Sequence, residues 1–290
     1  ADEGAETSER VAATVEDVAA SARAVERDIE TIRDARSEQT AMLAEIDEAI
    51  ASAGASRERE LADTGRIPTG VDGLDALCDG GIPQGGRAVV RHDDSRAVDR
   101  LVAQLSAAAI DDGLAVSLSP PPGFERATLA AALAAVDTGV DEALAADRLF
   151  VLDMFDDWAG GRNVFDLDRR SLGEVNERTA ERRDRPLLVV GNVAGEIEVL
   201  GERAARAARY DNDDGVLDAA DTVLNVVDDS AVDDSFAAFY AGAADQVLAV
   251  SGADRPTVEL ATAVDGTGGG SRRLVASSEP PFLAVASGGP

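Results

Sequence analysis

The chain contains no lysine, so all 27 of its basic residues are arginines, against 56 aspartates and glutamates in 290 residues. The formal net charge is −29. Proteins hold the phosphate backbone of nucleic acids with clustered Lys and Arg, so this balance argues against a nucleic-acid partner. Dense carboxylates are tolerated where molar salt shortens the Debye length to about 3 Å. The composition predicts a protein of a high-salt cytosol.

Cysteine and histidine each occur once, and aromatic residues make up 3% of the chain. Cys78 alone excludes an intramolecular disulfide, and His92 alone excludes a metal site built from several histidines. No apolar run reaches the roughly 20 residues that span a bilayer, and the first residues lack the basic and apolar regions of a signal peptide. We therefore predict a cytoplasmic protein that does not insert into a membrane.

The first 53 residues carry a heptad pattern. Apolar residues alternate at spacings of four and three, with polar breaks at Arg36 and Gln39 and no Pro or Gly between Gly4 and Gly54. A single amphipathic helix on a globular core is the alternative, but its apolar stripe drifts toward a period of 3.6 over this length. The pattern predicts a coiled-coil helix over 1–53. Its seam comprises Val11, Val15, Val18, Ala22, Val25, Ile29, Ile32, Leu43, Ile46 and Ile50.

The run from 8 to 50, especially IETIRDARSEQTAMLAEIDEAI, resembles the cytoplasmic coiled coil of methyl-accepting chemotaxis transducers of the halobacterial type. In that family such helices form antiparallel hairpins that dimerise. Here no returning helix and no hairpin tip follow. The resemblance implies an assembly segment that self-associates or pairs with another coiled-coil protein, such as a chemotaxis-type transducer.

A small, polar linker over 54–65 precedes a domain over 66–290. In this domain apolar runs of strand length alternate with helical runs, which predicts an α/β fold with a mostly parallel sheet and flanking helices. AADTVLNV at 219–226 and AADQVLAV at 243–250 indicate buried strands. The last three apolar runs, TVELATAV, RRLVAS and PFLAVA, predict antiparallel strands at the sheet edge.

The stretch RIPTGVDGLDALCDGGIPQGGRAVV, residues 66–90, resembles the entry to the RecA-like ATPase domains of the circadian-clock KaiC and archaeal RadA group. The shared features are PTG, GLD and GGIP, followed by a glycine and the strand that leads to the phosphate loop. The resemblance implies a RecA-like domain over 66–290.

The phosphate loop of that family is altered in this chain. A working loop presents backbone N–H groups from glycines, a lysine for the phosphates and a Ser or Thr for magnesium. Aligned without gaps, His92, Ser95 and Ala97 fall at the glycines, Val98 at the lysine and Asp99 at the hydroxyl. The remaining loop positions are Asp93, Asp94 and Arg96. Aspartates repel phosphates, and the chain has no lysine to replace the missing one.

The family's other catalytic positions are also changed. LSPPPG places Pro120 and Pro121 near the expected paired glutamates, and LLVVGNV offers Gly191 and Asn192 in place of the magnesium-binding Asp. If RLFVLD were the relevant strand, Asp153 would supply that acid. The sequence therefore predicts a non-catalytic regulatory or scaffold protein without a cofactor. The alternative is a diverged ATP-binding switch that uses ATP with Mg and in which arginines replace the lysine.

Other polar features have structural interpretations. Asp153, Asp221 and Asp245 are each expected to end a strand or cap a helix and not to coordinate a metal. GTGGGS at 266–271 is expected to be a turn between edge strands, because it lacks the GK[ST] of a phosphate loop.

Overall fold

The computed structural model describes residues 57, 60–93, 95–155, 157–158, 160–167, 171–207, 217–264 and 268–286. The predicted coiled coil over 1–53, with its whole seam, lies outside the described residues. Most of the predicted linker over 54–65 is described. Its residues 60–62 are helical, and Leu61 is buried.

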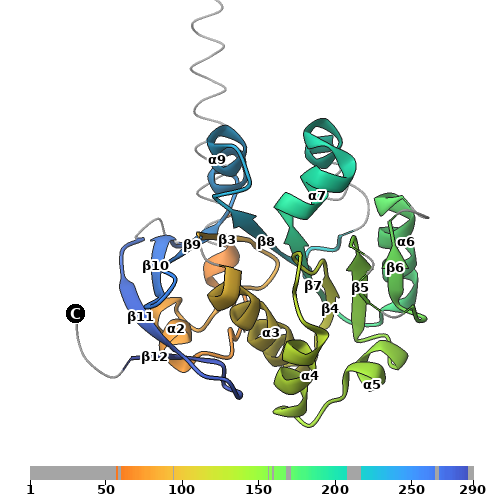
Figure 1. Cartoon of the computed structure of the whole chain (residues 1–290), viewed down its shortest axis with the longest axis horizontal. Helices are drawn as coiled ribbons and strands as arrows, with labels where there is room; N and C mark the ends of the chain where they lie inside the picture. Colours follow the sequence, from red (N-terminus) through yellow and green to blue (C-terminus); the bar gives the residue numbers. More distant parts are fainter. Residues whose placement is uncertain are drawn as a thin grey trace, which may run out of the picture. The chain divides into compact units, whose positions relative to one another are not determined.

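Within the described residues ten strands form one sheet, in the order β12-β11-β10-β9-β3-β8-β7-β4-β5-β6 (Figure 1). The seven strands from β9 to β6 in this order are parallel, and β10, β11 and β12 extend the sheet as antiparallel strands. The bounds are β3 (Arg87–His92), β4 (Ala115–Leu118), β5 (Leu149–Asp153), β6 (Val164–Asp166), β7 (Leu187–Asn192), β8 (Thr222–Asp228), β9 (Gln246–Ser251), β10 (Thr257–Thr262), β11 (Ser271–Ala276) and β12 (Leu283–Val285). The predicted mostly parallel sheet with an antiparallel edge is confirmed.

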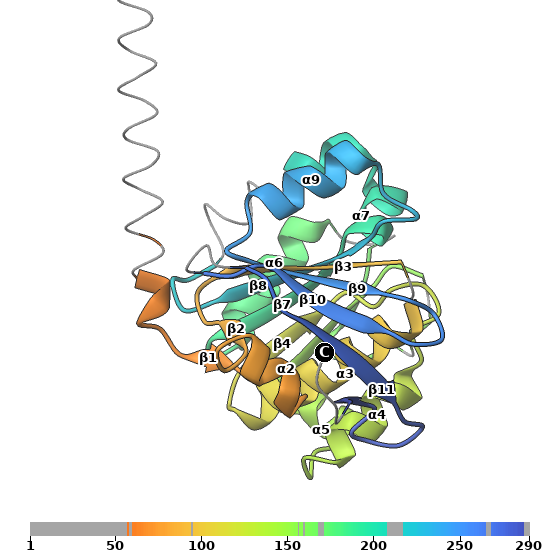
Figure 2. The same ribbon diagram turned by 90° about the vertical axis from the view of Figure 1, so that its left-hand side faces the viewer.

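Helices cover both faces of the sheet (Figure 2). One face carries α2 (Asp72–Leu77), α3 (Ser95–Asp111), α4 (Arg126–Ala134) and α5 (Val140–Ala145), and the other carries α6 (Leu172–Arg182), α7 (Val193–Leu200) and α9 (Asp234–Gly242). Successive strand residues face opposite sides, so neighbouring valines serve different cores. Val90 packs in the cluster with α3 and α4, whereas Val89 packs with Phe236 of α9. Strands buried on both faces explain why the sequence shows continuous apolar runs in them.

The PTG, GLD and GGIP motifs form a compact entry to the sheet. The Asp75 carboxylate accepts hydrogen bonds from the Thr69 N–H at 2.7 Å and the Thr69 hydroxyl at 2.6 Å, which ties PTG to GLD. Gly81 has a φ of +129°, and a Cβ there would lie 2.1 Å from the Ile67 carbonyl oxygen. Only glycine fits where β2 (Ile82–Pro83) pairs with β1 (Arg66–Ile67). The motif residues therefore have structural roles of their own.

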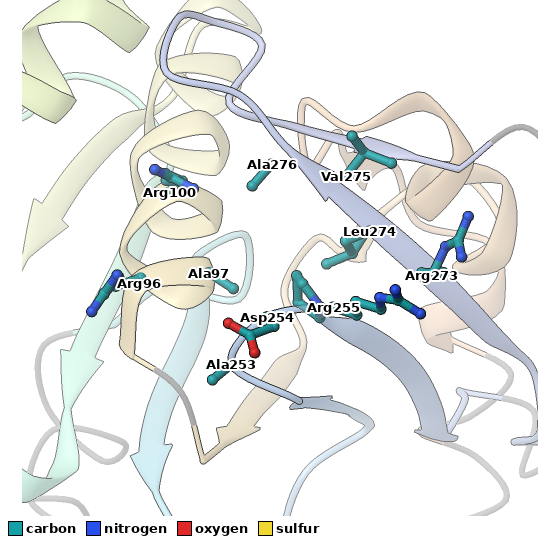
Figure 3. Close-up of a pocket in the computed structure, with 11 residues that line it drawn as sticks. Arg96, Ala97, Arg100, Ala253, Asp254, Arg255, Arg273, Leu274, Val275 and Ala276 are labelled. Atoms are coloured by element: carbon teal, nitrogen blue, oxygen red, sulfur yellow. The ribbon is translucent and has the colours of Figure 1, made fainter.

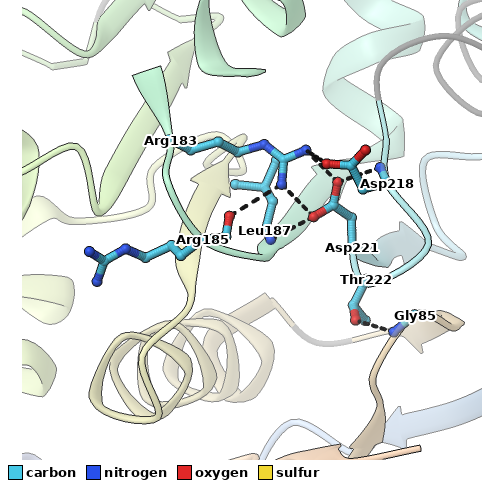
Figure 4. Close-up of polar contacts among 7 residues, drawn as sticks. All are labelled: Gly85, Arg183, Arg185, Leu187, Asp218, Asp221 and Thr222. Carbon is cyan, nitrogen blue, oxygen red and sulfur yellow. Dashed lines mark hydrogen bonds and ion pairs between the residues drawn. The ribbon is translucent and has the colours of Figure 1, made fainter. Parts of the chain in front are cut away.

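A buried ion pair joins the end of α6 to the starts of β7 and β8 (Figure 4). The Asp221 carboxylate accepts from both terminal nitrogens of Arg183, and Arg183 Nη2 lies 2.5 Å away. It also accepts from the N–H groups of Leu187 at 2.8 Å and Asp218 at 2.7 Å. The side chains of Arg183 and Asp221 are 7% and 1% exposed. Asp221 therefore has a structural role, but it directly precedes β8 and does not end a strand or cap a helix as predicted.

Asp245 also has a structural role, but it directly precedes β9 and does not end a strand or cap a helix as predicted. Its carboxylate accepts from the backbone N–H of Arg87 at 2.7 Å, at the start of the central strand β3. Gly268–Gly270, the described part of the GTGGGS segment, lie between β10 and β11. A turn was predicted there between edge strands.

Candidate functional site: the altered phosphate loop

The connection from β3 to α3 is short. β3 ends at His92 and α3 begins at Ser95, so only positions 93 and 94 separate the strand from the helix. In a working loop the G-x-x-x-x-G-K-[ST] pattern leaves an open segment whose N–H groups surround the phosphates. Here the helix starts three positions before the residue aligned with the lysine. The alteration is therefore one of backbone shape as well as of side chains.

The aligned lysine position faces the protein core. Val98 is 1% exposed and Ala97 is 4% exposed, and both belong to the cluster between α3 and the sheet. A side chain at 98 points toward apolar neighbours and not toward a ligand above the sheet edge. The burial of position 98 is a second physical reason for the absence of a lysine there, because an ammonium group at this position would be buried.

The other predicted loop residues separate from one another. His92 is buried at the end of β3. The exposed Asp93 accepts through Oδ1 from the N–H of Gly252 at 3.1 Å, which ties it to the turn after β9. Asp94 lies outside the described residues, and Ser95 is the first residue of α3. Arg96 is exposed and Asp99 is half-buried. Of the three aspartates predicted to repel phosphate, Asp93 is thus held by a backbone group.

Residues at the next strand ends have structural partners. Asn192 ends β7, and its Oδ1 accepts from the N–H of Gly195 at 3.2 Å, which caps α7. Its Nδ2 donates to the carbonyl oxygen of Pro120 at 3.3 Å. β7 is two strands from β3, whereas Asp153 ends β5, two strands further out. The Asp153 carboxylate accepts from three N–H groups of the loop that follows, with Trp158 at 2.9 Å. The predicted structural role of Asp153 is supported by these contacts.

Glu196, in the first turn of α7, is a titratable group that the sequence did not single out. A Cβ added to Gly191 would lie 3.3 Å from Glu196 Oε1 and 2.9 Å from Asn225 Oδ1. The carboxyl group therefore lies beside the buried end of β7, in space that an acidic side chain at 191 would need. Burial raises the pKa of Glu196 from 4.5 to about 7. Acidic residues shortly after a strand are common in sequences. The sequence therefore does not single out Glu196, whose burial is visible only in the folded structure.

Replacing Glu196 with glutamine is expected to flatten the pH dependence of stability. The raised pKa means that the folded state binds the proton more tightly than the unfolded state. The protonated carboxyl group therefore contributes its full stability below the unfolded pKa of 4.5, and this contribution is lost as the pH rises through about 7. At pH 8 the glutamine variant should be more stable than the parent by about 3 kcal/mol, because the pKa rises from 4.5 to about 7 and one pKa unit corresponds to about 1.4 kcal/mol.

Urea denaturation at about pH 5 and pH 8 would test this linkage. Glu198→Gln, at an exposed position of the same helix, is the matched control and should leave the pH dependence unchanged. Parallel pH profiles for the parent and Glu196→Gln would contradict the raised pKa.

The single thiol is unsuited to catalysis. Cys78 is buried, and burial followed by the nearby Asp75 charge raises its pKa to about 12. A thiol is nucleophilic only as its thiolate, so Cys78 is unreactive at neutral pH. Among the described residues no group of three His, Cys, Asp or Glu side chains is placed to hold a metal ion. The described helices also include none that is long and apolar enough to cross a membrane.

Comparison with known proteins gives similarity in structure but not in sequence. No protein-family model and no curated protein matches the chain. The fold is similar to that of a KaiC-like protein from the hyperthermophilic archaeon Pyrococcus horikoshii, with 14% identity and a TM-score of 0.59 over 77% of this chain and 100% of that one.

Two further solved structures give the same result. An uncharacterised protein from Pyrococcus horikoshii, solved in complex with an unknown peptide, has 14% identity and a TM-score of 0.58, again over 77% of this chain and 100% of that one. The flagellar accessory protein FlaH from Methanocaldococcus jannaschii has 12% identity and a TM-score of 0.50 over 78% and 100%. Identities this low establish the fold alone. The domain therefore has a KaiC-type RecA-like fold.

Proposed function

We propose that this chain is a non-catalytic RecA-like regulatory or scaffold protein that assembles through its N-terminal coiled coil. The observation that carries the non-catalytic half is the two-residue connection between β3 and α3, with Val98 buried where the family places its lysine. Phosphoryl transfer depends on positioned positive charge and a coordinated metal, and the altered loop has neither the lysine nor the magnesium-binding hydroxyl of a working loop.

The arginines near the loop do not restore a lysine at the matched position. Arg91 on β3 forms an ion pair with Asp229, with Nε 3.0 Å from Oδ1. Arg96 and Arg100 lie on α3 and line a pocket beside the loop. The rival function is an ATP-binding switch in which these arginines hold the phosphates of ATP with Mg. It is favoured by their position next to the loop and disfavoured by the two-residue connection.

Calorimetric titration of Mg-ATP into the full chain at molar KCl tests the non-catalytic half. We expect no saturable heat, because the loop offers no open set of N–H groups and carries Asp93. Circular dichroism on the same sample would establish that the protein is folded. Saturable binding that Arg96→Ala weakens would overturn the proposal in favour of the ATP-binding switch.

Deletion of residues 1–53 tests the assembly half. The alternating heptad spacing predicts that the full chain is oligomeric and that the truncated chain is a monomer. Light scattering at molar KCl gives the mass of each. Replacing the seam residues Ile29 and Ile32 with asparagine should dissociate the full chain, whereas the same change at the non-seam positions Thr31 and Asp34 should not. A full chain that is already monomeric would refute assembly through the arm.

A further inference from the structure

A pocket of about 550 Å³ opens between the start of α3, the turn from β9 to β10 and β11 (Figure 3). Four arginines line it, Arg96, Arg100, Arg255 and Arg273, together with one acid, Asp254. The chain has only 27 basic residues and a net charge of −29. A pocket with four arginines and one carboxylate is therefore a local reversal of charge on a strongly acidic protein.

Three of these arginines have no carboxylate partner among the residues that the structure describes. Within the described part of the chain, Arg100, Arg255 and Arg273 make no side-chain hydrogen bond or ion pair. Elsewhere arginines meet carboxylates directly, as Arg183 does with Asp221 and Arg126 with Asp141. Guanidinium groups left without carboxylates in a protein that has two acids for each base are available to an external anion.

The pocket also has an apolar component. Ala97 and Leu274 are buried in its wall, and Val275 at its margin is 50% exposed. Among the described residues the only other exposed large hydrophobic residue is Val199, at 37%. Arginines beside an exposed aliphatic side chain are typical of protein interfaces, whose centres are enriched in Arg and apolar groups.

The positions of the side chains indicate the shape of the ligand. Figure 3 shows Arg96 and Arg100 on the α3 side of the pocket and Arg255 and Arg273 on the opposite side, with Asp254 between the two pairs. A compact anion in the middle would meet Asp254 and would not reach both pairs. An extended chain can place one carboxylate on each pair and an apolar side chain against Leu274.

From these contacts we infer that the pocket is a docking site for an acidic polypeptide segment that carries an aliphatic residue between acidic ones. The Asp254 carboxylate accepts a backbone N–H of that segment, which a phosphate group cannot offer. This inference extends the proposed scaffold role by giving the chemistry of a partner. Carboxylate–guanidinium pairs at contact distance persist in high salt better than long-range attraction does, because screening removes the latter beyond about 3 Å at 1 M.

Fluorescence anisotropy with the full chain tests the site. The probe is a labelled synthetic peptide, Glu-Asp-Glu-Leu-Glu-Asp-Glu, and the control peptides replace its acids with Gln and Asn, or its Leu with Gly. We expect saturable binding of the acidic peptide and at least tenfold weaker binding of both control peptides. The double variant Arg100→Gln, Arg273→Gln should bind the acidic peptide at least tenfold more weakly. Arg272→Gln, on the same strand as Arg273 but outside the pocket lining, should change the affinity less than twofold.

Four outcomes would overturn the inference, and the first three concern the labelled peptide. These are no peptide binding, equal binding of the acid-free peptide, and binding that the double arginine variant leaves unchanged. Displacement of the peptide by inorganic tripolyphosphate at lower concentrations than the peptide itself requires would assign the pocket to small phosphate anions. Circular dichroism would establish that the variants fold. The titration is independent of Mg-ATP binding and of the arm deletion, so its failure would leave both halves of the proposed function standing.

Discussion

Replacing Asp221 with alanine is expected to destabilise the domain by about 3 to 5 kcal/mol, the range for removing one partner of a buried ion pair. The Arg183 guanidinium would remain buried without a carboxylate, since its side chain is only 7% exposed. The N–H groups of Leu187 and Asp218 would also lose their acceptor. Four donors depend on one side chain, which is why the loss exceeds that of an ordinary surface pair. Urea denaturation followed by circular dichroism measures it.

Two further variants separate charge from packing at this pair. Asp221→Asn keeps the shape of the side chain and removes its charge, so it should cause most of the loss of stability expected for Asp221→Ala. Asp218→Ala removes a carboxylate that is 84% exposed and lies 3.3 Å from Arg183 Nη2, and it should cost less than about 1 kcal/mol. If Asp221→Ala and Asp218→Ala were equally mild, the ion pair would not join α6 to β7 and β8 as described.

Replacing Val98 with lysine is expected to lower stability by about 3 kcal/mol and to create no binding of Mg-ATP. Val98 is 1% exposed and packed between α3 and the sheet. An ammonium group placed there loses its hydration, and the helix start at Ser95 leaves no open loop to receive phosphates. Denaturation and calorimetry on the same preparation give the two readouts.

Arg96→Lys is the matched control, because it introduces the same side chain two positions earlier, at an exposed site of the same helix. Its stability should change by less than about 0.5 kcal/mol. Saturable Mg-ATP binding by Val98→Lys would mean that α3 can unwind at its start to rebuild a phosphate loop. The non-catalytic state that we propose would then rest on side-chain identity and not on backbone shape.

Much of the fold could be predicted from the sequence because its signals are local. Apolar runs with small, polar or acidic residues between them located β8 and β9, and the last three runs located the antiparallel edge. The GGIP motif was informative because Gly81 has a conformation that only glycine adopts readily. These features are read within a few residues of chain, which is the range over which periodicity and turn chemistry operate.

The candidate site was less accessible to sequence reasoning. A gapless alignment assumes a loop of constant length, so it assigned Val98 to the lysine position without revealing that the helix has already begun. The Arg183–Asp221 pair and the four-arginine pocket each join segments far apart in the chain. No local pattern marks such pairs, and only the sheet order brings them together.

The position of β3 has a consequence for how the chain folds during synthesis. This strand lies between β8 and β9, whose residues follow it by more than 100 positions. A ribosome releases β3, with Val89 and Val90, long before either neighbour exists. The sheet can close at its centre only after residue 251 has emerged, so the early product presents unpaired strand edges and apolar side chains to the cell. We expect a nascent chain halted before β9 to be captured by chaperones, and a chain halted just beyond it to be the shortest that releases itself from them.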